Sequence, residues 1–102
     1  MVLVDFTVSP VGVGESLSGY VAGIVPILEA SGLEFRMHAM GTNIEGEWDE
    51  VFDVIKRCFE HVSRQAPRVA CHIRVDARAG SVPRLDAKVR SVEAKLGRKI
   101  PG

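Results

Sequence analysis

The sequence predicts a single α+β domain in which two helices cover one face of a four-stranded antiparallel sheet. Four short segments alternate apolar and polar residues, which is the period of a half-buried strand, and two longer segments carry apolar residues at helical spacing. The chain has 102 residues, a common length for one domain. We therefore expect one domain over residues 1–102.

The first predicted element is a strand over residues 2–8, where every second residue is apolar. A turn rich in glycine follows. Residues 17–28 then carry an apolar stripe at helical spacing, and Gly32 should end this helix because glycine readily adopts the left-handed conformation. Pro26 lies inside the helix and removes one backbone donor, so we expect a bend there.

A β-hairpin and a second helix follow. Residues 34–39 and 42–45 alternate in two short runs and predict the two strands of the hairpin. From Glu47 the apolar spacing becomes helical, and the helix should end before Pro67. Its predicted apolar stripe consists of Trp48, Val51, Phe52, Ile55, Phe59 and Val62.

The last predicted strand covers residues 69–76, and a short helix over residues 85–96, with Gly97 as its stop, follows it. The order strand, helix, strand, strand, helix, strand is the split βαβ arrangement of the ferredoxin-like fold. Each of the two longer helices has one apolar stripe, so together they can cover only one face of the sheet.

The other face of the predicted sheet is polar. If Val2 and its alternating partners face the helices, strand parity places a set of mixed charge on the opposite face, called the open face below. The set is Leu3, Asp5, Thr7, Arg36, His38, Asn43, Glu45, His72, Arg74 and Asp76. Such a face can be solvated, can meet a second subunit or can hold a small polar ligand. Because a small domain with a bare sheet face usually closes it by isologous pairing, we expect an oligomer.

The composition argues against several function classes. Lys+Arg and Asp+Glu are 13 each, so no net charge favours nucleic acid or an anionic membrane as a partner. No apolar run is long enough for a membrane span, and the N-terminus lacks the basic segment of a signal peptide. We therefore expect a cytoplasmic protein with neither nucleic acid nor membrane as partner.

No metal site, cofactor or catalytic residue is predicted. Cys58 and Cys71 lack the spacing of a metal motif and should be small buried groups, and His38, His61 and His72 share no zinc-binding spacing. No motif pairs a serine or cysteine nucleophile with a histidine. Carboxylates and histidines on the open face form compensating ion pairs more often than acid–base sites.

Three side chains near the helix starts are candidates for a ligand site. The loop PVGVGES lacks the spacing of a phosphate-binding loop, so Ser16 and Ser18 are expected as candidates to cap the first helix. Tyr20 and Trp48 are the only tyrosine and the only tryptophan, and each lies near a helix start. We expect both starts at one end of the sheet, where the two aromatics could rim one pocket. The alternative is that both are core residues.

Three stretches together resemble a known family: VDFTVSPVGVGESLSGYVA, MGTNIEGEWDEVFDVIKRC and VRSVEAKL. The chain is similar to the small thiamine-binding proteins, a YkoF-like group of stand-alone ferredoxin-like domains. The most specific piece is Met40–Thr42 followed by Glu45–Val51. The resemblance implies a cytoplasmic, non-enzymatic binder of thiamine or of its hydroxymethylpyrimidine moiety, assembled as a homotetramer from dimers that pair through their sheets.

The resemblance also implies the site residues. Matched to the family's motif are Ser16, Tyr20, Met40, Gly41, Thr42, Glu45 and Gly46. With two neighbours added, the candidate ligand-binding set is Ser16, Tyr20, His38, Met40, Thr42, Glu45 and Trp48.

An aminopyrimidine offers an amine donor and ring-nitrogen acceptors. Glu45 with Thr42 could pair with it while Tyr20 or Met40 lies against the ring.

Glu45 differs from the three acidic residues that follow it. Glu47, Asp49 and Glu50 are explained by the positive end of the helix dipole and require no ligand.

Two other functions stay open. One is a regulatory module like the ACT domains, which share this element order and bind amino acids at subunit interfaces. The other is a small enzyme that uses the open face.

Overall fold

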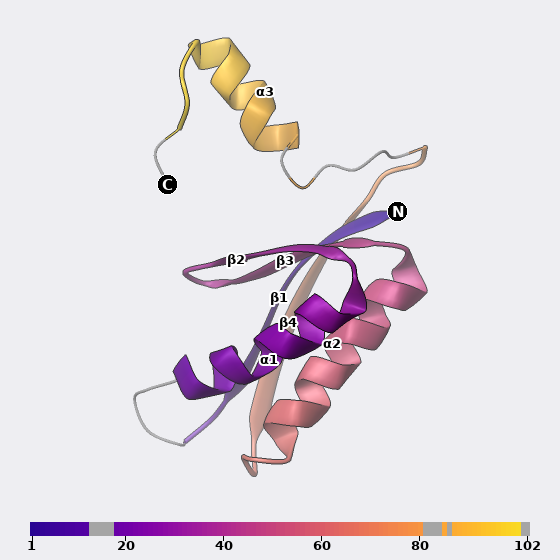
Figure 1. Cartoon of the computed structure of the whole chain (residues 1–102), viewed down its shortest axis with the longest axis vertical. Helices are drawn as coiled ribbons and strands as arrows, with labels where there is room; N and C mark the ends of the chain where they lie inside the picture. Colours follow the sequence, from indigo (N-terminus) through magenta and orange to yellow (C-terminus); the bar gives the residue numbers. More distant parts are fainter. Residues whose placement is uncertain (13–17, 81–84, 86, 101–102) are drawn as a thin grey trace.

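The computed structural model of the chain describes residues 1–12, 18–80, 85 and 87–100. The predicted order of elements is confirmed (Figure 1). The elements are β1 (Val2–Pro10), α1 (Ser18–Ser31), β2 (Glu34–His38), β3 (Gly41–Gly46), α2 (Trp48–Ser63), β4 (Val69–Ala77) and α3 (Ala87–Leu96).

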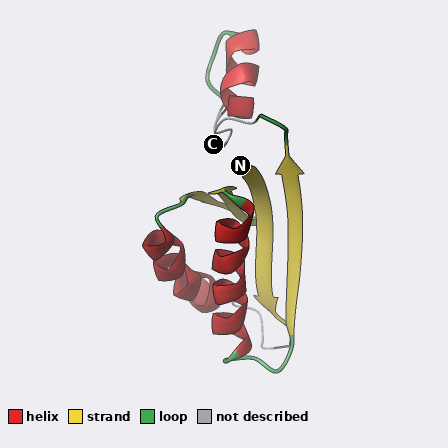
Figure 2. Cartoon of the chain, turned by 90° about the vertical axis from the view of Figure 1, so that its right-hand side faces the viewer, coloured by secondary structure: helices red, strands yellow, loops and turns green. Residues whose placement is uncertain are grey.

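The four strands form one antiparallel sheet in the order β2-β3-β1-β4, as the ferredoxin-like prediction requires. Val2 of β1 lies opposite Gly46 of β3, and Phe6 lies opposite Thr42, so these two strands run in opposite directions. Figure 2 shows α1 and α2 on one side of the sheet, while the other side carries no helix layer. The fold is therefore two-layered, with β4 at one edge.

The core lies between the sheet and its two helices. The alternation predicted for β1 is confirmed, since Val2, Val4, Phe6 and Val8 are all buried. From β3 and α1 the core includes Ile44, Ile24 and Leu28. Leu28 is fully buried. The core is thus built mainly from the helix-covered face of the central strands.

Helix α1 continues through Pro26 to Ser31. The Ser31 hydroxyl donates to the carbonyl oxygen of Leu28 at 2.6 Å, and the following Gly32 has a φ of +73°. Gly32 therefore ends the helix in the left-handed conformation, as predicted. Gly97 does the same after α3, with a φ of +71°.

The buried stripe of α2 differs from the predicted one. Val51, Ile55 and Val62 are buried as expected, and Val54 and Cys58 join them. Trp48 is 52% exposed and Phe59 is 39% exposed, which corrects their assignment to the buried stripe. The physical reason is that the apolar arc of α2 is wider than the arc that the sheet and α1 cover.

Helix α3 lies beyond the end of the sheet, apart from the two layers (Figures 1 and 2). Its apolar residues Val89, Val92 and Leu96 are between 42% and 53% exposed. Among the described helices, none is both long and apolar enough to cross a membrane.

Candidate functional site

A cavity of about 340 Å³ lies between the first half of α1 and the tip of the β2–β3 hairpin. It is lined by residues 6–9 of β1, by Val21 and Ile24 of α1, and by residues 37–42 of the hairpin. Its volume falls within the range of small-molecule sites, and mainly apolar walls with a few polar groups are typical of them. None of these lining residues is acidic.

Gly41 lets the hairpin approach β1 closely at the wall of this cavity. A Cβ at this position would lie 3.0 Å from the carbonyl oxygen of Phe6 and 3.0 Å from Cγ2 of Thr7. A backbone oxygen cannot swing aside as a flexible side chain can, so a larger residue would push the hairpin away from β1. The glycine of the Met-Gly-Thr sequence therefore has a steric role.

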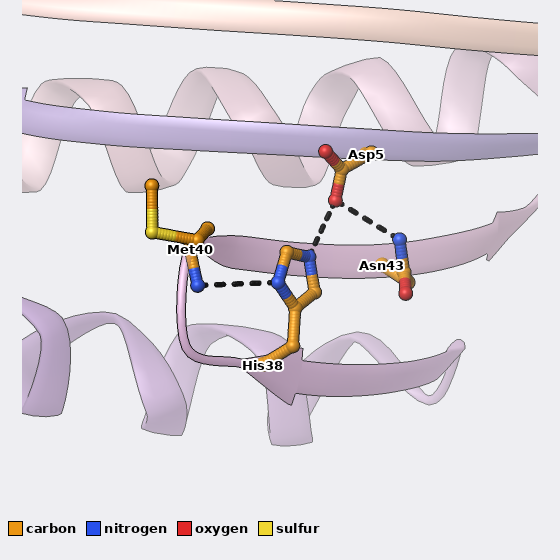
Figure 3. Close-up of polar contacts among 4 residues, drawn as sticks. All are labelled: Asp5, His38, Met40 and Asn43. Atoms are coloured by element: carbon orange, nitrogen blue, oxygen red, sulfur yellow. Dashed lines mark hydrogen bonds and ion pairs between the residues drawn. The ribbon is translucent and has the colours of Figure 1, made fainter. Parts of the chain in front are cut away.

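A hydrogen-bonded network fixes the hairpin tip to the open face of β1 (Figure 3). His38 Nε2 lies 2.6 Å from Asp5 Oδ1, and Asn43 Nδ2 donates to the same oxygen at 3.0 Å. The backbone N–H of Met40 donates to His38 Nδ1 at 3.2 Å. Residues of three strands and the turn are thereby held in one arrangement.

These contacts determine the tautomer of His38. Because Nδ1 accepts a hydrogen bond from the Met40 N–H, it carries no hydrogen, and the hydrogen must be on Nε2, which donates to Asp5. A second proton on Nδ1 would face the N–H of Met40 and remove its acceptor. The neutral imidazole is thus the form that holds the turn beside the cavity.

Of the predicted site residues, His38, Met40 and Thr42 line the cavity. Thr42 is 3% exposed and lies opposite Phe6, on the helix-covered face, whereas Met40 is 81% exposed at the tip of the hairpin. Tyr20 is half-buried on the first turn of α1 and packs against the core. Ser16 lies outside the described residues.

Glu45 lies elsewhere. It is 4% exposed, and its register with Leu3 and Glu34 places it on the open face, as parity predicts. The backbone N–H of Leu85, which follows β4 in the chain, donates to Glu45 Oε1 at 3.3 Å. Since Thr42 is on the opposite face, the two side chains of one chain cannot meet one aminopyrimidine ring, contrary to the expectation.

Trp48 and Tyr20 lie at opposite ends of the sheet, which corrects the prediction that they rim one pocket. Helix α1 follows the end of β1, whereas α2 follows Gly46, which lies opposite Val2 at the start of β1. Two neighbouring antiparallel strands finish at opposite ends of the sheet, so the helices that follow them also start at opposite ends. The Trp48 ring instead stacks on Phe52, with the ring centroids 4.5 Å apart.

Two of the residues singled out by the sequence are thiols in or near the core. Cys58 is fully buried, as expected, and Cys71 is half-buried. Burial, and secondly the neighbouring Cys71 thiol, raises the pKa of Cys58 to about 11, and burial also raises the pKa of Cys71. Such thiols are poor nucleophiles. Within the described residues no group of three potential metal ligands occurs.

A second cavity, of about 430 Å³, lies at the other end of the sheet between the chain start and residues 77–80. Arg78 is the only charged side chain in its described lining, and no predicted site residue borders it. The first cavity is therefore the better candidate.

Sequence reasoning missed the apolar walls of the first cavity, Val21 and Ile24 of α1, although their spacing of three residues places them on one helix face.

Comparison with known proteins supports a family assignment. A family model described as thiamine-binding protein matches residues 4–93. The UPF0045 protein sll0230 of Synechocystis is 47% identical over 93% of this chain and 79% of its own length.

Two solved structures share the fold. The hypothetical protein MJ1052 of Methanocaldococcus jannaschii has a TM-score of 0.83 and 26% identity, covering 89% of this chain and 94% of that one. A candidate thiamine biosynthesis/salvage protein of Thermotoga maritima has a TM-score of 0.77 and 22% identity, covering 89% of this chain and 97% of that one.

Proposed function

Because the chain belongs to the family of thiamine-binding proteins, we propose that it is a non-enzymatic binder of thiamine or of its hydroxymethylpyrimidine moiety. The observation that carries the proposal is the cavity at the hairpin tip, since the Met-Gly-Thr sequence forms one of its walls. Cytoplasmic location and a homotetramer built through the sheets are parts of the same proposal.

The chemistry of the cavity favours the pyrimidine half of thiamine. The buried hydroxyl of Thr42 can donate to a ring nitrogen or accept from the exocyclic amine, and the neighbouring apolar walls can lie against the ring. The thiazolium half is cationic, and the described lining offers no carboxylate to it. We therefore place the pyrimidine inside the cavity and the thiazolium toward solvent.

The remaining candidate residues have different roles in this proposal. His38 holds the turn through the N–H of Met40, and the exposed Met40 side chain closes over the ligand from the rim. Tyr20 packs against the core and is not among the residues that line the cavity, so it is assigned no direct ligand contact. Ser16 keeps only the role that the resemblance implies, because it lies outside the described residues. Glu45 and Trp48 are not assigned a ligand contact, because neither borders the cavity.

The test is titration calorimetry of the purified protein with thiamine, with hydroxymethylpyrimidine and with the thiazole alcohol alone. We expect saturable binding of the first two and none of the third. Absence of heat with both pyrimidine ligands up to millimolar concentration would refute the proposal. A parallel thermal-shift screen of amino acids tests the ACT-like alternative, since only a bound ligand raises the melting temperature.

Three variants locate the site. Thr42→Val removes the hydroxyl and keeps the shape, so the dissociation constant should rise about tenfold, the worth of one hydrogen bond. Thr42→Ser retains the hydroxyl and is the matched control, with a smaller change expected. Glu45→Gln should leave the affinity unchanged. A large loss with Glu45→Gln and none with Thr42→Val would move the site to the open face.

A further inference from the structure

Strand β1 is longer than its pairing with β3, and the part without this partner borders the cavity at the hairpin tip. β1 pairs with β4 along its whole length, from Val2 to Pro10, but its pairing with β3 ends where Phe6 lies opposite Thr42. Val8, the next residue on the same face as Phe6, is among the residues that line the cavity. The main chain of β1 therefore continues past the end of β3 and forms part of the cavity wall.

The direction of the Val8 main-chain groups follows from the pairing on the other side of β1. The N–H of Val11 donates to the carbonyl oxygen of Arg68 at 2.8 Å, on the β4 side. In an antiparallel sheet the N–H and C=O of one residue point to the same neighbouring strand, and successive residues alternate between the two neighbours. Because Val8 lies three residues before Val11, its N–H and C=O point away from β4 and toward the β3 side.

The hairpin does not supply a partner for these groups. In the β1–β3 register, the next pair after Phe6 and Thr42 that would exchange hydrogen bonds is Val8 and Met40. Met40 instead lies in the turn, and its N–H donates to Nδ1 of His38 at 3.2 Å (Figure 3). Within the part of the chain that the structure describes, no hydrogen bond reaches the main chain of Val8 from the β3 side.

An unpaired main-chain amide is unusual at a buried position. Val8 is 9% exposed, and nearly all buried backbone N–H and C=O groups of folded proteins are paired. A buried polar group that the chain itself leaves unpaired is normally satisfied by water or by a ligand. The wall of the cavity thus presents one hydrogen-bond donor and one acceptor side by side, on an otherwise apolar residue.

From these observations we infer that the N–H and C=O of Val8 are the recognition edge of the cavity, and that they pair with a flat heteroaromatic ring carrying an amine beside a ring nitrogen. The amine donates to the Val8 C=O, and the ring nitrogen accepts from the Val8 N–H. The ligand then takes the place that Met40 would have in a longer strand ladder. Resting on the proposed function, this pairing identifies the atoms of the chain that select the aminopyrimidine edge of thiamine.

The surroundings of Val8 suit such a ring. Hydrogen bonds between strands lie close to the plane of the sheet, so a ring paired with this edge has one face toward the helix layer. Val21 and Ile24 of α1 line the cavity on that side. Apolar side chains against the face of a ring, with a few polar groups at its edge, are the usual composition of a small-molecule site.

Amide hydrogen exchange followed by NMR tests the arrangement. Without ligand, the Val8 N–H should exchange about tenfold faster than the N–H groups of Thr7 and Ser9, which point toward β4 and are matched controls in the same strand. Saturating hydroxymethylpyrimidine should slow the exchange of Val8 about tenfold and that of the controls much less. Equal protection of all three groups in the free protein would overturn the inference.

A thermodynamic cycle tests the contact itself. In the protein, the hydroxy-acid analogue of valine at position 8 replaces the amide by an ester and removes the Val8 N–H. In the ligand, C–H replaces the ring nitrogen beside the amine. Each change alone should weaken binding about tenfold, the worth of one hydrogen bond. Both together should weaken it no further, because they remove the same hydrogen bond. Losses that multiply would show that the two atoms do not meet, and they would contradict the pairing.

Calorimetry separates a failure of the proposed function from a failure of the Val8 pairing. If hydroxymethylpyrimidine gives no heat of binding, both are refuted. If it binds while the exchange rate of the Val8 N–H stays unchanged, the ligand is held by other groups, and only the pairing with Val8 is refuted.

Discussion

The buried thiol of Cys58 predicts an alkaline loss of stability. Burial raises its pKa in the folded protein to about 11, whereas an unfolded thiol titrates near 9. The unfolded state therefore gains from ionisation above pH 9 while the folded state does not. The contribution of the neutral thiol is fully present below pH 9 and is lost as the pH rises through 11. Two pKa units correspond to about 2–3 kcal/mol.

Urea unfolding of the wild type and Cys58→Ala between pH 8 and pH 11 measures this effect. At pH 8 the variant should be less stable by about 1 kcal/mol, because a small buried group is lost. Toward pH 11 the wild type should lose about 2–3 kcal/mol that the variant keeps, so that the order of stability reverses. Other titrating groups are shared by the two proteins, and Cys71, which is coupled to Cys58, titrates without that neighbour in the variant.

Val62→Ala is the matched control, since it removes a similar volume from the same buried face of α2 without removing a titrating group. Its deficit relative to the wild type should be constant with pH. If the difference between Cys58→Ala and the wild type is equally constant, the thiol is solvated in the folded protein and the reasoning is refuted.

Three further predictions concern the core and the hairpin. Leu28→Ala should lower the free energy of unfolding by about 2–5 kcal/mol, because the side chain is fully buried; a loss below 1 kcal/mol in urea would contradict its position. Gly41→Ala should destabilise by about 1–3 kcal/mol through its contact with the β1 backbone, whereas Gly19→Ala, with open space around its Cβ, should not destabilise. Asp5→Asn should weaken ligand binding about two- to tenfold without touching the cavity, because it loosens His38; unchanged affinity would separate the network from the site.

The elements were predictable because each segment has a clear period. The alternation over residues 2–8 and 69–76 gave strands that the structure extends by only one or two residues, to Pro10 and Ala77. Gly32 and Gly97 predicted the ends of α1 and α3 by residue type alone, and both have the positive φ that such a helix end requires. Periodicity specifies which face a residue occupies, and for the strands this was sufficient.

The sequence did not predict which residues on each face are buried by other segments of the chain. Parity placed Glu45 on the open face correctly, yet the residue is buried there, and the N–H of Leu85, forty residues later in the chain, donates a hydrogen bond to it. Phe59 has the spacing of a core residue but is 39% exposed, because the apolar arc of α2 is wider than the part of the helix surface that the sheet and α1 cover. Both outcomes depend on packing between distant segments.

The candidate site was predicted in part. The hairpin residues His38, Met40 and Thr42 line one cavity, as their proximity in the sequence allowed. The grouping of Tyr20 with Trp48 failed because neighbouring antiparallel strands end at opposite ends of the sheet, a consequence that the predicted antiparallel order already contained. The link from Asp5 to the turn required a register between β1 and β3 that only the structure provides.

Strand β4 has one further consequence for the behaviour of the chain at high concentration. It is nine residues long and forms an edge of the sheet, and such an edge is a template for pairing with other chains. Arg74 and Asp76 are exposed on this strand, beside His72. Charges on an edge oppose the stacking of flat strands that leads to aggregation. Resistance to aggregation thus gives these side chains a physical role that neither the core nor the cavity requires of them.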